Sequence, residues 1–429
     1  MTDGQLVVPS ASRLMGSLRS IGYDLSSAVA DLVDNCLDAG ARHIEIDLVH
    51  EGRDSYVVIS DDGRGMREAE LDEAMRYGSR RSYAGDSLGH FGLGLKTASL
   101  SQCRRLTVAS TTSVRRKPVC RRWDLDRVRE TDQWLLQEPE PDELPGGVAR
   151  RLQRHRGTIV VWQALDRVLE FRNAESGHAR RALERAGDRV AEHLGAVFHR
   201  FLDGSLETTV QMQVNGELVK PWDPFARDEP KTRHLPMNRL PVEIDDTEAA
   251  VSVQGFILPH QRQFSSPDAH ERASGLNKWN RQQGFYIYRG DRLVQSGGWS
   301  RLRTADEHTK LARIAVDLPE GAEHLFALDV AKMRVKLPDS LRVTLKEHVS
   351  VIANLAQEAY RRGAGGIDAG EEVGRQFDQA TMGDVWHDVA TLLERELSDN
   401  PKLLDRVLVA LANAAPASAD EPDTAMTAI

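Results

Sequence analysis

Acidic, amide and glycine residues recur in three short motifs within the first hundred residues. The first motif, DLVDNCLDA at residues 31–39, has Asp31, Asn35 and Asp38 at positions i, i+4 and i+7 of a helical pattern. Residues at this spacing share one face of a helix, and we expect that face to be polar and opposite the core stripe. A carboxylate with an amide one turn away suits a hard cation such as Mg²⁺, which leaves room for phosphates and water. A solvated helix face is the alternative interpretation of this motif alone.

Two glycine-rich motifs follow. The second, SDDGRGM at residues 60–66, comes after a strand-like run, and its glycines allow the backbone to approach a flat ligand closely. Alone it is equally typical of a hairpin turn. The third, GHFGLGLKTAS at residues 89–99, runs into a helix whose first amides and positive dipole end can hold phosphate. It lacks the Gly-Lys-Ser/Thr ending of a P-loop, and it does not lie in the strand–turn–helix context of a dinucleotide-binding fold. The ordered set of three motifs is stronger evidence for a nucleotide site than any one motif.

The elements that would position these motifs indicate an α+β fold. Apolar residues at helical spacing predict a helix over residues 26–39 that ends at Gly40. Residues 43–48 and 56–60 are strand-like runs around a turn, which predicts a hairpin. Further strands are expected at residues 106–109, 158–162 and 208–214, and a long helix at about residues 179–201. This pattern is typical of helices packed on a mixed sheet.

The second half of the chain predicts further domains. A shift in composition after residues 220–224 indicates a second domain that begins near Leu206 and contains strands at residues 284–289 and 311–316 and a helix at residues 340–362. Residues 363–366 have the composition of a linker, and helical periodicity returns at residues 373–414. The predicted domains are therefore residues 1–205, 206–350 and 351–415, followed by a disordered tail at residues 416–429.

Length and composition limit the class of protein. A chain of 429 residues, 40% hydrophobic and 28% charged, is expected to form two or three globular domains. No apolar run approaches the roughly 20 residues that cross a bilayer, and the N-terminus lacks the pattern of a signal peptide, so we expect a cytoplasmic protein without a membrane contact. Three cysteines without a Cys-x-x-Cys pair predict free buried thiols rather than disulfides or a zinc site. The net charge of −9 gives no overall attraction to nucleic acid, although a local basic patch remains possible.

The order of the motifs resembles the GHKL ATPase superfamily, which includes gyrase B, the large heat-shock chaperones, MutL, histidine kinases and MORC proteins. Residues 31–39 resemble its N box, residues 61–65 its first glycine box, and residues 89–94 its second glycine box, within the ATP lid. Gly157 and Thr158 resemble the third box. The resemblance covers about residues 10–350 and implies a Bergerat-type ATPase sandwich, an S5-like transducer domain, and ATP with Mg²⁺ as cofactors.

The resemblance also implies roles for single residues. Asn35 would hold Mg²⁺, Asp61 would accept the adenine amino group, and Thr158 would support that contact. The implied nucleotide-binding set further contains Asp38, Gly63, Gly65, Met66, Gly89, Gly92, Leu93, Gly94, Leu95 and Lys96, of which Gly92, Gly94 and Lys96 would meet the phosphates. The family usually has a glutamate as catalytic base at the position of Asp31. Because aspartate is one methylene shorter and a base needs hydrogen-bond reach, slow hydrolysis is expected.

The second half resembles the transducer region of the MORC and MutL-like branch. The similar segments are residues 284–293, Gly298 with Trp299, and residues 327–332. In that branch a lysine of the transducer reaches the γ-phosphate, and Lys332 is the candidate for this catalytic role, with Lys336 as the next choice. A solvated surface lysine is the alternative interpretation.

Together these features predict an ATP-gated dimeric clamp that binds Mg-ATP and hydrolyses it slowly. If the chain is a bacterial relative of MORC, it is expected to work in DNA transactions such as anti-phage defence, on double-stranded DNA and with separately encoded partner proteins. Basic residues between Arg104 and Arg156 are the candidate DNA surface, and their neutralisation by neighbouring acids is the alternative. A chaperone-like ATPase and an ATP-sensing scaffold without DNA binding are the competing functions. A histidine kinase is disfavoured because only about ten to twenty residues precede the first predicted helix.

Overall fold

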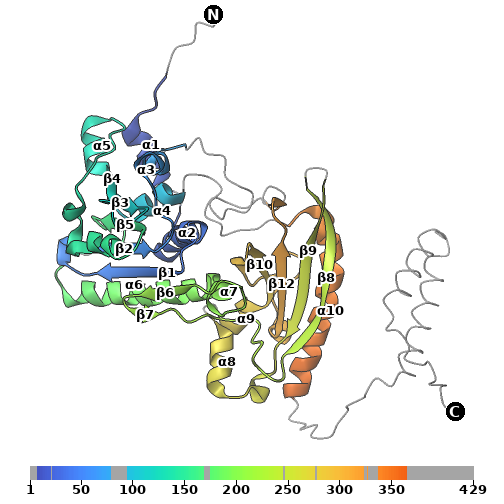
Figure 1. Cartoon of the computed structure of the whole chain (residues 1–429). Coiled ribbons are helices and arrows are strands. Elements are labelled where there is room, and N and C mark those ends of the chain that lie inside the picture. The colour runs from blue at the N-terminus through green and yellow to red at the C-terminus, as the bar shows by residue number, and fades with distance from the viewer. Residues whose placement is uncertain are drawn as a thin grey trace, which may run out of the picture. The chain divides into compact units, whose positions relative to one another are not determined.

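Two sheets and the helices packed on them make up the part of the chain that the computed structural model describes. It describes residues 7–20, 22–78, 94–168, 174–244, 247–275, 278–322, 326 and 337–364. All of these belong to one compact unit, Met1–Gly365 (Figure 1). The predicted mixed α+β architecture is confirmed.

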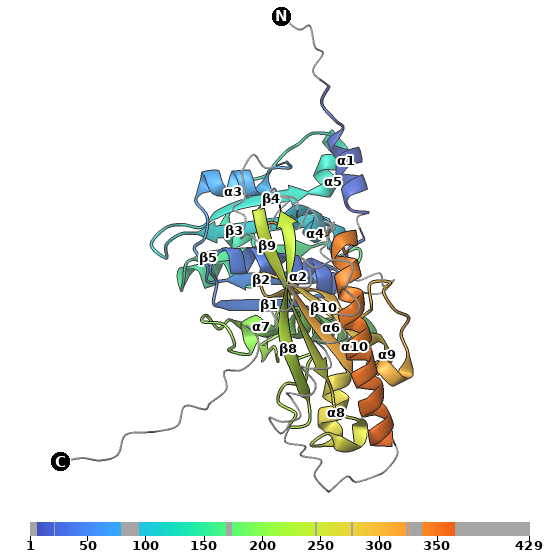
Figure 2. The same cartoon turned by 90° about the vertical axis from the view of Figure 1, so that its right-hand side faces the viewer.

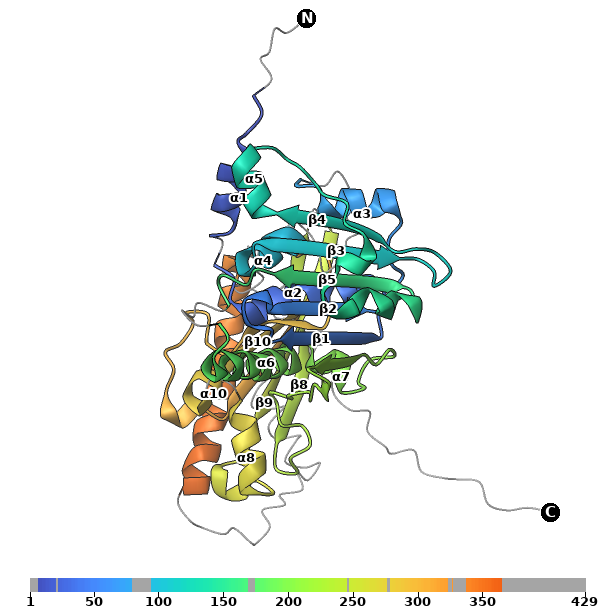
Figure 3. The same cartoon turned by 90° about the vertical axis from the view of Figure 1, so that its left-hand side faces the viewer.

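The first sheet has seven strands in the order β4-β3-β5-β2-β1-β6-β7. Its strands are β1 (His43–Val49), β2 (Tyr56–Asp61), β3 (Arg105–Thr111), β4 (Val119–Asp124), β5 (Gly157–Gln163), β6 (Gln211–Val214) and β7 (Glu217–Leu218). Figure 3 shows β4, β3, β5, β2 and β1 side by side in this order. The hairpin expected at residues 43–60 is the antiparallel pair of β1 and β2, while β6 runs parallel to β1.

Helices cover one face of this sheet. They are α1 (Ala11–Leu18), α2 (Leu25–Asp38), α3 (Glu68–Met75), α4 (Gly94–Gln102), α5 (Leu125–Thr131) and α6 (Gly177–Val197). Ile44 and Ile46 of β1 share one apolar core with Leu32 and Val33 of α2. The alternate side chains of the strands point to the other face, where Val148 and Leu152 of the 3-10 segment η3 (Pro145–Gln153) pack on β2 and β5. Cys36, Cys103 and Cys120 are buried and free, as predicted.

The second sheet has five strands in the order β11-β10-β12-β9-β8. Its strands are β8 (Arg233–Ile244), β9 (Thr247–Ile257), β10 (Gly284–Arg289), β11 (Arg292–Ser296) and β12 (Ala312–Leu318), and the helices α8 (Pro267–Ser274) and α9 (Lys278–Gln282) lie between β9 and β10 in the chain. The long helix α10 (Asp339–Ala364) runs alongside the sheet (Figure 2). Leu341, Leu345 and Val349 of α10 pack against Ile314 and Val316 of β12 in one core.

The structure differs from several predicted element boundaries. The helix expected at residues 179–201 is interrupted at Phe198, whose φ of −110° and ψ of 21° are not helical, so α7 (His199–Leu202) is separate from α6. The first sheet extends beyond residue 206, because β6 pairs with β1. Helix α10 crosses the boundary expected between residues 350 and 351 and includes Gly363 and Ala364 of the expected linker.

The predicted helical region at residues 373–414 and the predicted tail at residues 416–429 lie outside the described residues. The limits of the predicted domains remain predictions. Within the described ranges, the structure has no helix with the length and apolar character that a membrane span requires.

Candidate nucleotide-binding site

Helix α2 carries the first motif. Asp24 caps its N-terminus by accepting the backbone N–H of Ser27 at 2.7 Å, which satisfies one of the free amides of the first turn. Asp31 is only 3% exposed, whereas Asn35 is exposed and Asp38 is half-buried. The alternative interpretation of a solvated helix face therefore does not hold at Asp31, because neighbouring elements cover this part of the helix.

The carboxylate of Asp31 lies where the first and third motifs meet. Its Oδ2 accepts a hydrogen bond from the Tyr23 hydroxyl at 2.7 Å. A β-carbon added at Gly94, the first residue of α4, would lie 3.6 Å from the same oxygen. The start of the helix that follows the glycine loop thus borders Asp31. One turn further along α2, Asn35 donates its side-chain N–H to the Asp31 carbonyl at 3.0 Å.

Asp61 ends strand β2 in a buried position. It is 5% exposed, its Oδ1 accepts the backbone N–H of Gly63 at 2.8 Å, and the Cys36 thiol of α2 also contacts its carboxylate. Burial raises the pKa of Asp61 to about 6, since removal from water disfavours the charged form. A buried carboxylate of this kind is a strong acceptor for an amino group of a planar ligand.

The second motif requires glycine for steric reasons. Gly65 has a φ of +67°, and a β-carbon at this position would lie 2.0 Å from the carbonyl oxygen of Thr111. A β-carbon at Gly157 would lie 1.9 Å from the carbonyl oxygen of Asp61. Both glycines let neighbouring backbones approach more closely than any side chain permits.

Ser110 of β3 connects the second motif to Gly157 and Thr158, the residues that resemble the third glycine box, through hydrogen bonds. Its hydroxyl accepts the backbone N–H of Met66 at 2.9 Å and lies 2.9 Å from both the Gly157 carbonyl oxygen and the Thr158 hydroxyl. Thr158 is the partner of Asp61 in the pairing of β2 with β5. The structure therefore brings Asp61, Met66 and Thr158 together at one end of the sheet.

Lys96 of α4 is buried and reaches away from solvent. Its Nζ donates to the carbonyl of Ala74 at 2.7 Å and lies 5.8 Å from the centre of the Tyr77 ring. Burial lowers the pKa of Lys96 to about 8. The Tyr77 ring in turn lies 5.8 Å from the ring of Trp123 and 5.4 Å from that of Trp134. Tyr77, Trp123 and Trp134 thus form an aromatic cluster, and Tyr77 lies two residues before residue 79 in the chain.

Comparison with known proteins agrees with this geometry. Residues 23–158 match the family model of the histidine kinase-, DNA gyrase B- and HSP90-like ATPases. This region is a GHKL ATPase domain of the MORC and MutL-like branch. Over 86 residues, 20% of the chain, the sequence is 35% identical to the ATPase morc-1 of Caenorhabditis elegans, of which the match covers 10%. Over 217 residues, 49% of the chain, it is 28% identical to the DNA mismatch repair protein MutL of Salmonella arizonae, of which the match covers 31%. The chain thus spans less than a third of the length of either relative.

Several predicted site residues lie outside the described residues. They are Gly89, Gly92 and Leu93 of the predicted second glycine box and Lys332 and Lys336 of the predicted transducer. The described part of the GHKL domain contains the others, with Gly94 and Leu95 in the first turn of α4. Tyr23 and Ser110 were not predicted. Tyr23 precedes α2 and belongs to none of the three motifs, although its partner Asp31 is only eight residues away, and no local pattern distinguishes a serine such as Ser110 that bonds to residues far along the chain.

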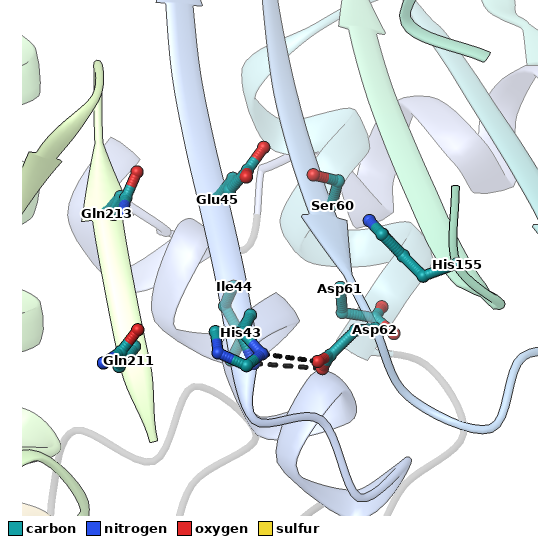
Figure 4. A pocket seen from close by; sticks show the side chains of 9 residues that line it. All are labelled: His43, Ile44, Glu45, Ser60, Asp61, Asp62, His155, Gln211 and Gln213. Carbon is teal, nitrogen blue, oxygen red and sulfur yellow. Dashed lines mark hydrogen bonds and ion pairs between the residues drawn. The ribbon is translucent and has the colours of Figure 1, made fainter. Parts of the chain in front are cut away.

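A polar hollow of about 230 Å³ lies elsewhere on the GHKL domain. His43, Ser60 and His155 line it, and the His43 Nδ1 lies 2.6 Å from a carboxylate oxygen of Asp62 (Figure 4). His43 and Ser60 alternate along their strands with residues of the α2-facing core, so the hollow opens on the opposite face of the sheet. Asp61 borders the hollow, but its carboxylate contacts Cys36 on the α2 side. The hollow is therefore distinct from the candidate nucleotide site.

Proposed function

We propose that the GHKL domain binds Mg-ATP and hydrolyses it slowly. One observation carries this proposal: the first motif lies in helix α2, and the other two motifs, which are separate in the sequence, border the same helix. Asp31 of α2 adjoins Gly94 of the third motif, and Cys36 of α2 contacts Asp61 of the second. A ligand beside α2 would therefore meet all three motifs at once.

In this proposal each end of the nucleotide has its own partners. Asp61 accepts the adenine amino group, with Thr158 beside it, while Gly63, Gly65 and Met66 form the wall of the adenine site. The phosphates lie at the start of α4, where Gly94, Leu95 and Lys96 follow Gly89, Gly92 and Leu93, because free amides at a helix N-terminus bind anions. Lys332 is proposed to reach the γ-phosphate from the second half of the chain.

Asn35 is the proposed magnesium ligand, and Asp38 completes the polar end of α2. The donor set fits the ion, since Mg²⁺ takes oxygen ligands and Asn35 is exposed with its amide nitrogen directed to the Asp31 carbonyl. The bound ion would neutralise negative charge on the phosphates. Asp31 is proposed to take the proton of the attacking water. Its bond to Tyr23 occupies one lone pair of the carboxylate, and its side chain is shorter than the usual glutamate, so we expect slow turnover.

Two substitutions in α2 test this assignment. Asn35→Ala is expected to abolish binding of Mg-ATP, and Asp31→Asn is expected to retain binding but lose turnover. Asp188→Asn, an exposed aspartate of α6, is the matched control and should change neither. Binding is measured with a fluorescent ATP analogue and turnover by phosphate release. Equal affinity of Asn35→Ala and wild type would contradict the proposal.

We further propose that ATP drives two chains together as a clamp, since the sequence of residues 77–102 has the length and glycine content of the ATP lid of the GHKL family. Ordering of such a segment by a γ-phosphate can bias a bistable element. A non-hydrolysable ATP analogue should increase the dimer fraction in sedimentation velocity. An unchanged distribution at saturating analogue would contradict the clamp.

Double-stranded DNA is the proposed ligand of the clamp, in transactions such as anti-phage defence with separately encoded partners. The DNA mismatch repair name of the MutL relatives supports this proposal. The structure narrows the candidate surface, because several arginines of the predicted patch are ion-paired: Arg104 with Asp126, Arg105 with Asp124, Arg121 with Asp72, Arg122 with Glu143 and Arg151 with Asp47. Arg115 and Arg116 are exposed in the loop between β3 and β4, and they are the proposed DNA contacts. A chaperone-like ATPase or an ATP-sensing scaffold remains the alternative.

A further inference from the structure

Arg292 of β11 extends from the second sheet to helix α2 of the GHKL domain. Its Nε donates to Asp34 Oδ1 at 2.8 Å, and its Nη2 lies 3.7 Å from Asp31 Oδ1. The side chains of Arg292, Asp34 and Asp31 are 5%, 0% and 3% exposed. The two sheets are thus joined by a buried ionic contact at the proposed catalytic aspartate.

The charges in this contact explain why Arg292 is there. Asp31 and Asp34 are three residues apart on α2, so their carboxylates lie on neighbouring parts of one helix face. Two buried carboxylates repel each other, and a buried charge requires a partner. The guanidinium group is suited to this position because it is planar and carries several N–H donors, so it can contact two carboxylates at once. The Phe198 ring, whose centre lies 5.7 Å from the guanidinium carbon, covers the same group.

Arg292 contacts the two aspartates differently. Asp34 receives a direct hydrogen bond, whereas the distance of 3.7 Å to Asp31 exceeds a hydrogen bond and leaves an electrostatic contact. Tyr23 donates to the second oxygen of Asp31 at 2.7 Å. The Asp31 carboxylate therefore lies between a hydroxyl group of its own domain and a positive charge of the second sheet.

We propose that Arg292 is a positioning residue through which the second sheet holds the Asp31 carboxylate beside Gly94, so that ATP turnover depends on the docking of the two sheets. This inference rests on the proposed role of Asp31 as the base. Arg292 acts on turnover through Asp31, and its bond to Asp34 anchors the guanidinium group in place.

The test is a set of variants of the full chain. Arg292→Gln is expected to lower kcat about 10- to 100-fold, because small displacements of a reacting group have effects of this size, while the affinity for a fluorescent ATP analogue stays near that of wild type. Arg292→Lys keeps the charge and should recover part of the loss. Arg239→Gln, an exposed arginine of β8, removes the same charge from the second sheet and should leave kcat unchanged.

A double variant separates positioning from structural support. Arg292→Gln alone leaves Asp34 buried without this partner, which can lower stability; Arg292→Gln with Asp34→Asn removes that charge as well, and its thermal unfolding should return toward wild type. We expect its kcat to stay low. Recovery of wild-type kcat in the double variant would overturn the inference, since Arg292 would then serve Asp34 alone.

The failure of this inference is distinguishable from the failure of the proposed function. Unchanged turnover in Arg292→Gln, together with an inactive Asp31→Asn, would overturn the role of Arg292 and leave Asp31 as the base. Full turnover in Asp31→Asn would overturn both.

Discussion

Asp61 and Thr158 are partner residues in the antiparallel pairing of β2 with β5. Gly157, next to Thr158, lies so close to the Asp61 carbonyl that no side chain fits between them. The pairing holds the Asp61 carboxylate in a buried position with a raised pKa of about 6. The free protein therefore carries the cost of a buried charge, which a ligand that donates to this carboxylate would offset.

Asp61→Asn is expected to stabilise the free protein and weaken ATP binding. The carboxylate has a pKa of about 6 in the folded state and an ordinary pKa of 3.8 when exposed to water, so above pH 6 its charge opposes folding by up to about 3 kcal/mol. Between pH 6 and 3.8 the folded state binds a proton that the unfolded chain lacks, and the penalty disappears. The variant should therefore unfold at a higher temperature than wild type at pH 7.5, with the difference vanishing near pH 4. ATP affinity should fall about 10- to 100-fold through loss of a charged acceptor.

The neighbouring Asp62 is the matched control for this substitution. Partial burial raises the pKa of Asp62, but hydrogen bonds from the backbone N–H and the ring of His43 and from the backbone N–H of Arg42 outweigh it and hold this pKa below its usual value. Asp62→Asn should therefore destabilise the fold above pH 4, the opposite sign to Asp61→Asn. Thermal melts that shift in the same direction for both variants would contradict the assignment of a buried charge to Asp61.

ATP binding is expected to take up a proton at Lys96. Burial places the pKa of Lys96 near 8, so about half of the free protein carries a neutral amine at pH 8. Nearby phosphates favour the charged form, and affinity should fall as the pH rises through 8. Calorimetric titration in two buffers of different ionisation enthalpy measures the uptake, and Lys96→Met should abolish it. A heat of binding that is independent of the buffer at pH 8 would contradict a phosphate contact by Lys96.

Gly65→Ala is expected to destabilise the protein and weaken ATP binding. The substitution combines the strain of a positive φ, about 1 kcal/mol, with a collision against the Thr111 carbonyl. Gly40→Ala is the matched control, because Gly40 has a similar φ of +72° but no atom within 4 Å of the added β-carbon. Urea unfolding should show a much larger loss of unfolding free energy for Gly65→Ala than for Gly40→Ala. Equal losses of unfolding free energy would contradict a steric requirement for glycine beside the Thr111 carbonyl.

Charge reversal at the tip of the β3–β4 hairpin tests the DNA proposal. Arg115→Glu with Arg116→Glu should lower the affinity for duplex DNA and leave ATP binding intact, and wild-type binding should weaken steeply between about 50 and 200 mM salt because phosphate contacts release counterions. Arg181→Glu with Arg185→Glu, at exposed positions of α6, changes the net charge equally and serves as control in fluorescence anisotropy. Equal weakening by both pairs would contradict a contact at the hairpin tip. No binding of wild type to any duplex would favour the chaperone-like or scaffold function.

Local patterns predicted the elements that carry the motifs but not the contacts between them. The strand-like runs at residues 43–48 and 56–60 correspond to β1 and β2, and the stripe from Ala28 to Leu37 corresponds to α2. Strand β8 was missed because it is an edge strand, mostly exposed and interrupted by Pro236 and Pro241, so its burial does not alternate.

Sequence patterns could not predict the environment of the aspartates in α2. A helical wheel distinguishes polar from apolar positions, and by that criterion Asp31 and Asp34 would be exposed to solvent. The partner that makes their burial possible, Arg292, lies 258 residues from Asp34 in the chain. Long-range ion pairs of this kind leave no periodic signal, which is why the catalytic candidate was identified and its surroundings were not.

The aromatic cluster of Tyr77, Trp123 and Trp134 gives the protein an intrinsic optical reporter. The indole N–H of Trp123 donates to the Met75 carbonyl at 3.0 Å, so this fluorophore is bound to the last turn of α3, which precedes the second glycine box in the chain. Nucleotide binding that rearranges the contacts of this cluster would alter the polarity and quenching around the indoles of Trp123 and Trp134. Tryptophan emission, with Trp134→Phe as the reference, would then follow ATP binding in the unlabelled chain on the time scale of the binding step itself.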